Sequence, residues 1–249
     1  MRNRTDAIFA LIAVNAIFYV VTYLVPGMEG RMFDALALYF PKNENFAWWQ
    51  FVTNMFMHGG LMHILFNMYA LWAFGSPLEV IWGKQRFLLF YFLSGIGAGV
   101  IYTIVNYYQF NNIYNELISM GVSASDIEKL LQTGTYDSAL VPESFKTSLT
   151  NFYYLYRTPA VGASGAIYGV LVAFGILFPN AKLALIFLPV PIAAKYFIPI
   201  LIALDLFSGI TGVSIFGGGI AHFAHIGGAI IGFLLMWYWK KNIPARGDR

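Results

Sequence analysis

The chain has 249 residues, of which 59% are hydrophobic, 18% aromatic and only 11% charged. Because soluble globular domains carry about 25% charged residues, this composition predicts an integral membrane protein in contact with the lipid bilayer. The net charge of +3 does not indicate a nucleic-acid partner, and the lack of cysteine excludes disulfides, thiolate nucleophiles and cysteine-bound zinc.

The N-terminal part of the chain predicts a membrane anchor followed by an interfacial segment. Residues 1–6 form a short tail with two arginines, and the apolar run from Ala7 to Val25 has about the 20 residues that span a bilayer core. A secretory signal peptide also begins with basic and then apolar residues, but this run is too long for one, so we interpret it as a retained anchor. Residues 26–50 mix charged and aromatic side chains, which is typical of a segment lying in the membrane interface.

Hydropathy predicts five further transmembrane helices. The residues from Gln109 to Thr158 are polar and predict an insertion outside the hydrocarbon, in which Ser125 and Glu128 resemble a capping box that opens a short helix. The sequence therefore predicts an all-α polytopic bundle of six spans over residues 7–240, followed by a basic tail at 241–249. The five further spans are expected at about 57–74, 87–107, 161–178, 194–211 and 219–239.

The distribution of Lys and Arg predicts the orientation of this bundle. Six spans place both termini on one side of the membrane, and most of the 15 basic residues fall on that side. Because basic residues in short loops collect on the cytoplasmic side, we expect the tails at 1–6 and 241–249 to be cytoplasmic and the insertion at 109–158 to be extracytoplasmic. The expected location is a bacterial plasma membrane.

Small residues surround Ser164 at the start of the fourth predicted span. Gly162 and Gly165 lie on either side of it, and glycine lets a substrate backbone approach closely, so a substrate carbonyl could lie against Ser164 and its amide. Small residues in a membrane helix also mark tight helix packing, and a lone GxSG sequence does not distinguish the two readings.

Polar residues of the second, fourth and sixth spans are expected to share one depth, because these three spans start from the same face. Histidine suits the removal of a serine proton, which makes His225 the candidate base for Ser164. His63 and Asn67 lie four residues apart on one face of the second span and could donate hydrogen bonds to a developing oxyanion. Tyr168 follows Ser164 by one helical turn and could pack against the imidazole of His225.

Two other features of the last spans bear on this arrangement. Gly228 and Gly232 share the helical face of His225 and predict a close contact of that face with the fourth span. Asp205 is the only acidic residue well inside a predicted span, where a carboxylate costs roughly 2.5 to 3.5 kcal/mol. We expect it to make a structural hydrogen bond or ion pair in the bundle, and a histidine-orienting carboxylate is the alternative.

Three motifs together resemble the rhomboid intramembrane serine proteases, over about residues 7–240. The resemblance implies Ser164 as nucleophile and His225 as base, a dyad without a required acid, with His63, Asn67 and the Ser164 amide as the oxyanion hole. It implies an endopeptidase, without cofactor or metal, that cleaves transmembrane segments of membrane-protein substrates near the outer face. We also assign Gly162 and Tyr168 to substrate binding. The motifs are GASG at 162–165 with Tyr168, HGGLMHILFN at 58–67 and AHIGGAIIG at 224–232.

The chain also departs from the family pattern, and other functions stay open. Many members carry Trp-Arg before the second span, where this chain has Trp49-Gln50, so the positioning that the arginine gives is in doubt. A proteolytically inactive relative that binds membrane clients is the alternative function, although such relatives typically lose the serine or the histidine. His58 is expected as a structural hydrogen bonder. A metal site is a third possibility, without support from an HExxH motif, and would use His58, His63, His222 and His225. The sequence does not give the oligomeric state.

Overall fold

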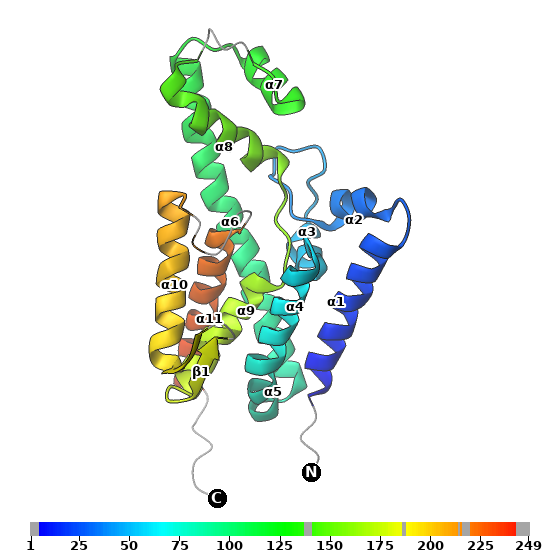
Figure 1. Cartoon of the computed structure of the whole chain (residues 1–249), viewed down its shortest axis with the longest axis vertical. Coiled ribbons are helices and arrows are strands. Elements are labelled where there is room, and N and C mark those ends of the chain that lie inside the picture. Colours follow the sequence, from blue (N-terminus) through cyan, green and yellow to red (C-terminus); the bar gives the residue numbers. More distant parts are fainter. Residues whose placement is uncertain (1–4, 137–140, 186–187, 214, 216–219, 243–249) are drawn as a thin grey trace, which may run out of the picture.

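The computed structural model describes residues 5–136, 141–185, 188–213, 215 and 220–242, and it is nearly all helical (Figure 1). This confirms the predicted all-α membrane fold, apart from one short β-hairpin. The helices are α1 (Asp6–Leu24), α2 (Met28–Leu36), α3 (Gln50–Thr53), α4 (Leu61–Ala70), α5 (Ser76–Trp82), α6 (Lys84–Ser119), α7 (Ala124–Thr133), α8 (Lys146–Arg157), α9 (Ser164–Leu177), α10 (Ala194–Thr211) and α11 (His222–Asn242).

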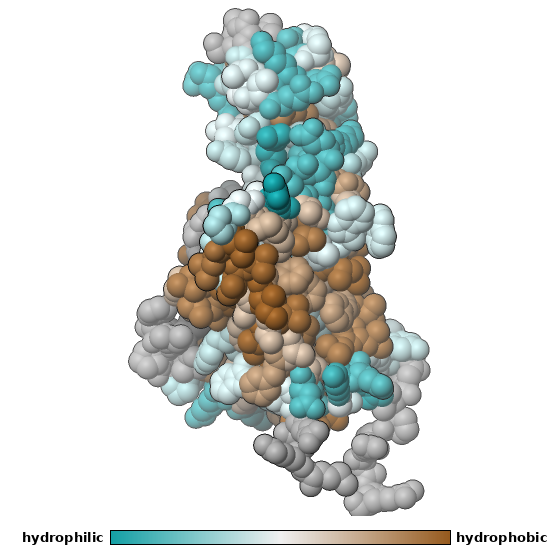
Figure 2. Space-filling view, turned by 90° about the vertical axis from the view of Figure 1, so that its right-hand side faces the viewer, coloured by the Kyte–Doolittle hydropathy of each residue, from teal (hydrophilic) through white to brown (hydrophobic). Residues whose placement is uncertain are grey.

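On the face drawn in Figure 2, an apolar belt covers the middle of the molecule, between more hydrophilic surfaces towards its two ends. Among the described residues, four helices are long and apolar enough to cross a membrane, namely Asp6–Leu24, Leu61–Trp82, Lys84–Ser119 and Ala194–Thr211. The second of these consists of α4 and α5, joined by a π turn. The start of α1 and the end of α11 lie at the same end of the bundle, which agrees with an even number of crossings (Figure 1). The expected number of six stays a prediction.

Helix α9 lies at the centre of the bundle, packed against α6 and α11. Its 14 residues correspond to about 21 Å, which is less than the roughly 30 Å of a hydrocarbon core. A helix this short is tolerated because most of its side chains are buried by protein and not by lipid. Its first residue, Ser164, therefore need not reach the membrane surface.

Glycines bring the backbones of α9 and α11 into direct contact. A Cβ atom at Gly228 would lie 1.8 Å from the carbonyl oxygen of Gly165, and one at Gly232 would lie 2.5 Å from the Cα of Gly169. Only residues without a side chain fit at such a distance. This confirms the close contact predicted from the spacing of Gly228 and Gly232.

A buried carboxylate fixes the start of α1 against α5. Glu79 is 2% exposed, and its two carboxylate oxygens accept hydrogen bonds from the backbone N–H groups of Ala7 at 2.8 Å and Ile8 at 3.0 Å. The first N–H groups of a helix have no intrahelical partner and carry partial positive charge, so a carboxylate satisfies both needs. This contact joins segments that are far apart in the sequence.

Helix α6 is much longer than the predicted third span. The sequence predicted an end near Tyr107, but the helix continues to Ser119 because no glycine or proline follows between these two residues. It ends where Gly121 adopts a φ of 87° and the N–H group of Val122 bonds to the carbonyl oxygen of Leu117. The predicted boundary at Gln109 is therefore not a structural boundary, since the helix runs through it into the polar segment.

The upper part of α6, α7 and α8 form a cap at the end of the molecule opposite to the start of α1 (Figure 1). We use this name for residues 110–136 and 141–157. The cap has an apolar core of its own, although its surface is polar (Figure 2). This core contains Phe40 of the loop between α2 and α3 and, from the cap, Phe110, Leu117, Val122, Ile127, Leu130, Leu131, Val141, Phe145, Leu149 and Phe152.

The short helix in the cap begins two residues earlier than its predicted capping box implied. Helix α7 starts at Ala124, and its N-cap is Ser123, whose Oγ accepts a hydrogen bond from the N–H group of Asp126 at 3.1 Å. The predicted pair of Ser125 and Glu128 was therefore wrong in register. Ser123 and Asp126 have the same spacing, and the extended backbone of Ser123 leaves its side chain free to cap.

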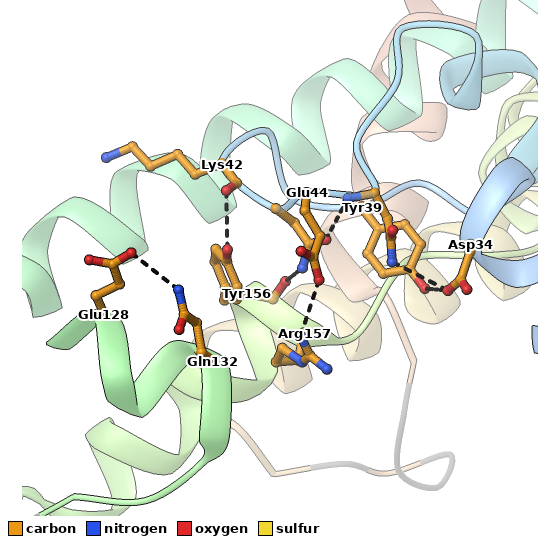
Figure 3. Close-up of polar contacts among 10 residues, drawn as sticks. Asp34, Tyr39, Lys42, Glu44, Glu128, Gln132, Tyr156 and Arg157 are labelled. Carbon is orange, nitrogen blue, oxygen red and sulfur yellow. Dashed lines mark hydrogen bonds and ion pairs between the residues drawn. The ribbon is translucent and has the colours of Figure 1, made fainter. Parts of the chain in front are cut away.

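The cap is joined to the loop between α2 and α3 by polar contacts (Figure 3). The hydroxyl of Tyr156 donates to the carbonyl oxygen of Lys42 at 3.2 Å, and the side-chain amide of Asn43 donates to the carbonyl oxygen of Tyr156 at 2.9 Å. Arg157 and Glu44 form an ion pair at 4.0 Å. The ammonium group of Lys42 also lies 5.0 Å from the ring centre of Phe110, so the loop and the cap support each other.

The sequence analysis did not predict the hairpin between α9 and α10. Strands β1 (Lys182–Leu185) and β2 (Leu188–Ala193) pair antiparallel, with Lys182 opposite Ala193 and Leu183 opposite Ile192. Pro189 and Pro191 disfavour a helix here, and a two-stranded ribbon tolerates proline because its strands are edges. The hairpin lies at the end of the bundle where α11 ends (Figure 1).

Candidate active site

Backbone contacts on two sides fix the segment that leads into Ser164. Ala160 and Leu38 exchange backbone hydrogen bonds of 2.8 and 2.9 Å, and the N–H group of Gly162 donates to the carbonyl oxygen of Asn54 at 3.0 Å. Gly162 has a φ of 124°, a value that side chains disfavour, so glycine is needed to turn the chain into α9. Ser164 is the first residue of that helix.

Ser164 and His225 lie within hydrogen-bonding distance of each other. The Nε2 atom of His225, on α11, is 2.8 Å from the Oγ atom of Ser164 on α9. The imidazole of His225 also stacks on the ring of Tyr168, with ring centres 4.2 Å apart and planes 13° apart. The stacking restrains the imidazole plane, so that Nε2 stays directed at the hydroxyl. A serine with a base at this distance has the geometry of an activated nucleophile.

His63 on α4 lies next to Gly162, close to Ser164. A Cβ atom at Gly162 would lie 2.8 Å from the Nε2 atom of His63 and 3.5 Å from the Oγ atom of Ser164, so the bare glycine separates the two side chains. The Nδ1 atom of His63 accepts a hydrogen bond from the N–H group of Gly59 at 3.3 Å. The proton of a neutral His63 imidazole is then on Nε2, which makes that atom a donor toward Ser164. Asn67, one turn further along α4, is also buried.

A small cavity of about 20 Å³ adjoins Ser164 and has room for about one water molecule. Asn54 and Tyr102 supply polar side chains to its lining, beside small residues of α6 and α9. The glycines at 162 and 165 also line it. Small side chains around the hydroxyl of Ser164 thus leave free space next to it.

Asp205 contacts both histidines of the first turn of α11. This residue of α10 is 1% exposed, and its Oδ1 atom lies 2.6 Å from Nδ1 of His222 and 3.2 Å from Nδ1 of His225. The hydroxyl of Tyr168 donates a hydrogen bond to Oδ2. The contact with His225 is the one that a histidine-orienting carboxylate requires. The sequence did not connect His222 to this network, although its position three residues before His225 places both on one helical face.

The remaining histidine, His58, packs beside the site. It is 2% exposed, and its ring lies edge-on to that of His63 with centres 5.0 Å apart. Its backbone carbonyl oxygen accepts a hydrogen bond from the hydroxyl of Tyr23 at 3.0 Å, which links α1 to the site. Among the described residues, no group of three or more His, Cys, Asp or Glu side chains is arranged to hold a metal ion.

Gln50 organises the loop in which the family pattern has arginine. Its side chain is fully buried and makes four hydrogen bonds with backbone groups. Oε1 accepts from the N–H groups of Tyr39 at 3.2 Å and Ala47 at 3.1 Å, and Nε2 donates to the carbonyl oxygens of Asp34 at 3.3 Å and Asn45 at 2.7 Å. The neutral amide, with its acceptor and donor ends, therefore holds this loop together. Arginine has no acceptor and could not bond the same two N–H groups.

Tyr39 in the same loop stays protonated. Burial, together with the hydrogen bond that its hydroxyl donates to Asp34 at 3.1 Å, raises the pKa of Tyr39 to about 12. The contact therefore does not change at physiological pH.

Comparison with known proteins identifies the family. The profile of the rhomboid domain matches residues 45–242 of this chain. Rhomboid protease AarA of Providencia stuartii is 28% identical over 234 residues, which cover 90% of this chain and 68% of that protein.

Two mitochondrial proteins are also similar. The presenilin-associated rhomboid-like protein of Homo sapiens is 29% identical over 242 residues, covering 94% of this chain and 50% of the relative. Rhomboid protein 1 of Saccharomyces cerevisiae is 27% identical over 198 residues, covering 80% of this chain and 44% of the relative. The chain thus spans about half the length of these two relatives. Since the rhomboid domain accounts for most of its residues, this multi-pass membrane protein belongs to the rhomboid family.

Proposed function

We propose that this protein is an intramembrane serine endopeptidase that cleaves transmembrane segments of membrane proteins through Ser164 and His225. The observation that carries the proposal is the distance of 2.8 Å between Nε2 of His225 and Oγ of Ser164. The stacking of Tyr168 on the imidazole supports it, because a restrained ring keeps its nitrogen on the serine. The similarity to AarA, which is named a rhomboid protease, agrees with this activity.

In the proposed reaction, His225 removes the proton of Ser164 as Oγ bonds to the carbonyl carbon of the scissile peptide. The carbonyl electrons move to oxygen, and the negative charge that develops is stabilised by Nε2–H of His63, by Asn67 and by the backbone N–H group of Ser164. His225 then gives its proton to the leaving nitrogen as the C–N bond breaks. Water releases the acyl group by the same steps.

The site suits an extended substrate segment. Gly162 lies between Ser164 and His63 and presents no side chain, so a substrate backbone can approach both. We therefore assign Gly162 to substrate binding. Tyr168 acts through its stacking on His225 and borders the same space. A helical substrate would have to unwind locally, because its carbonyl groups are otherwise bonded within the helix.

The proposed orientation follows the distribution of basic residues. Both termini are cytoplasmic, and the cap is extracytoplasmic, so that cleavage takes place near the outer face. A bacterial plasma membrane is the proposed location, and the similarity to a protein of Providencia stuartii agrees with it. The relatives named as mitochondrial make a mitochondrial membrane the competing location.

The proposal is tested with the full chain in proteoliposomes and a fluorescent transmembrane peptide as substrate. We expect the wild type to cleave the peptide with or without a metal chelator, and Ser164→Ala to cleave none of it. Residual turnover by Ser164→Ala above a no-enzyme control would contradict the assigned nucleophile. A wild type that retains the peptide without cutting it would favour the alternative, an inactive relative that binds membrane clients.

A further inference from the structure

The carboxylate of Asp205 lies within hydrogen-bonding distance of three side chains. Its Oδ1 atom is within 3.2 Å of Nδ1 of His225 and within 2.6 Å of Nδ1 of His222, and Oδ2 accepts from the hydroxyl of Tyr168. An ionised carboxylate accepts hydrogen bonds and donates none, so this set of contacts suits the charged form. A charged group inside a membrane-spanning bundle is costly unless it is paired. The presence of Asp205 here therefore indicates a role other than packing.

The two ring nitrogens of His225 need opposite states in the proposed reaction. Nε2 must be unprotonated to accept the proton of Ser164, so the ring proton must be on Nδ1. A carboxylate oxygen facing Nδ1 favours this tautomer, and it stabilises the imidazolium that forms when the serine proton arrives. Asp205 lies at the place from which it can do both.

We propose that Asp205 is a positioning residue that fixes the tautomer and orientation of His225, and that His222 and Tyr168 hold its carboxylate in place. The inference rests on the proposed serine protease function and extends the Ser164–His225 pair to a network of five side chains. His222 is the closer partner, at 2.6 Å against 3.2 Å for His225. The carboxylate thus keeps a second imidazole partner while His225 changes its protonation state.

The surroundings of His225 contain few side chains, other than Asp205, that could set its protonation state. The titratable groups that face it are Asp205 from α10, Tyr168 from α9 and His63 from α4. Tyr168 is neutral and already donates to Asp205, and His63 directs its own proton toward Ser164. Among the described neighbours of His225, Asp205 is therefore the side chain that offers Nδ1 a negatively charged acceptor.

The main test is Asp205→Asn in the full chain, with cleavage of the transmembrane peptide followed from pH 5 to 9. We expect kcat to fall at least about a hundredfold with KM unchanged, since loss of the corresponding carboxylate in a soluble serine protease costs about 10⁴. The acid limb of the pH profile should also move to lower pH, because the imidazolium loses its negative partner. If the role of Asp205 were purely structural, Asp205→Asn would lower the thermal stability of the protein and leave the acid limb of the pH profile unchanged.

Ser208→Ala is the matched control. Ser208 lies one turn from Asp205 on α10 and is 2% exposed, and its hydroxyl has no hydrogen-bond partner among the described residues. We expect this variant to keep the wild-type kcat and pH profile. A folded Asp205→Asn that behaves in the same way would overturn the proposal.

His222→Ala tests the second part of the network. We expect a smaller loss of kcat, about tenfold, and no further loss when His222→Ala is combined with Asp205→Asn, because residues that act as one unit are not additive. Losses that multiply in the double variant would overturn the role of His222.

One measurement does not depend on the folding of any Asp205 variant. In the wild type labelled with ¹⁵N-histidine, NMR shifts of the ring nitrogens should show His225 protonated on Nδ1 near neutral pH, and an Nε2-protonated ring would overturn the proposal. The Ser164→Ala variant keeps the two proposals separate. If it is inactive while the wild type cleaves, the protease function stands whatever the Asp205 variants do.

Discussion

The contact of α9 with α11 in the central bundle and the core of the cap are packed in opposite ways. In the bundle, α9 and α11 meet backbone to backbone through Gly165 and Gly228, whereas the cap is filled by large side chains such as Phe110 and Phe152, whose ring centres lie 4.5 Å apart. Lipid tails are as apolar as leucine, so membrane helices gain little by burying large apolar groups against each other and gain more by close approach. The cap faces water and folds by burial of apolar area. The surroundings of each region, lipid or water, thus explain which residue types form its packed contacts.

The bundle should tolerate no added methyl group where the glycines meet. Gly228→Ala places a Cβ atom 1.8 Å from the carbonyl oxygen of Gly165, so α9 and α11 must separate, at a cost of more than about 3 kcal/mol. Since these helices carry Ser164 and His225, we expect cleavage to be abolished. The measurements are peptide cleavage and thermal unfolding in detergent.

Gly30→Ala is the control for this change. Gly30 lies in α2, and a Cβ atom there would meet nothing within 4 Å, so the variant should be neutral or slightly more stable. If Gly228→Ala were equally harmless, the contact between the two backbones would not control the active site.

The cap should respond to the opposite change, the loss of a large side chain. Phe152→Ala empties the centre of its apolar core, and we expect a cost of about 3 to 5 kcal/mol. The expected result is local: faster hydrogen exchange in α7 and α8, with the thermal unfolding of the bundle little changed. Tyr154→Ala, on the same helix but 58% exposed, should change stability by less than about 0.5 kcal/mol. Unfolding of the whole chain as one unit would contradict two separately packed regions.

Loss of the proposed oxyanion donors should affect the rate of cleavage and not the packing. Asn67→Ala is expected to reduce kcat by about a hundred- to a thousandfold, which corresponds to about 2.7 to 4 kcal/mol. His63→Ala should have a similar effect, and one donor can partly replace the other. Single-turnover kinetics with folded protein check this prediction. A wild-type rate in either variant would show that the residue was wrongly assigned.

The smallest expected effect comes from the loop that joins the two regions. Gln50→Ala leaves buried N–H groups of Tyr39 and Ala47 without their side-chain acceptor, at a cost of about 1 to 3 kcal/mol. Cleavage should slow only indirectly, through the backbone contact of this loop with Ala160. Gln132→Ala removes one exposed hydrogen bond, to Glu128, and is the control with almost no expected effect (Figure 3). Equal melting temperatures of the two variants would contradict the role of Gln50.

Sequence alone predicted most of the fold and the meeting of the central residues. The fifth span was predicted at its observed bounds, Ala194–Thr211, where Pro191 precedes the helix and Gly212 ends it. The approach of His225 to Ser164 followed from topology and from the glycines of α11, which require a close helix contact.

Other features depend on information that a linear pattern lacks. The contact of Asp205 with His222 depends on how α10 is rotated about its axis, which hydropathy does not specify. The role of Gln50 depends on the path of a loop without periodicity. The extension of α6 to Ser119 does not follow from hydropathy, because polar residues continue a helix as readily as apolar ones.

The length of α6 gives the two regions a mechanical connection. One helix of 36 residues, about 54 Å long, carries Ala98 and Tyr102 in the wall beside Ser164 and Phe110 and Leu117 in the core of the cap. No glycine or proline lies between Tyr102 and Leu117 to act as a hinge, so this part of the helix turns as a rod. A sideways force on the cap is therefore a torque on the wall of the active site.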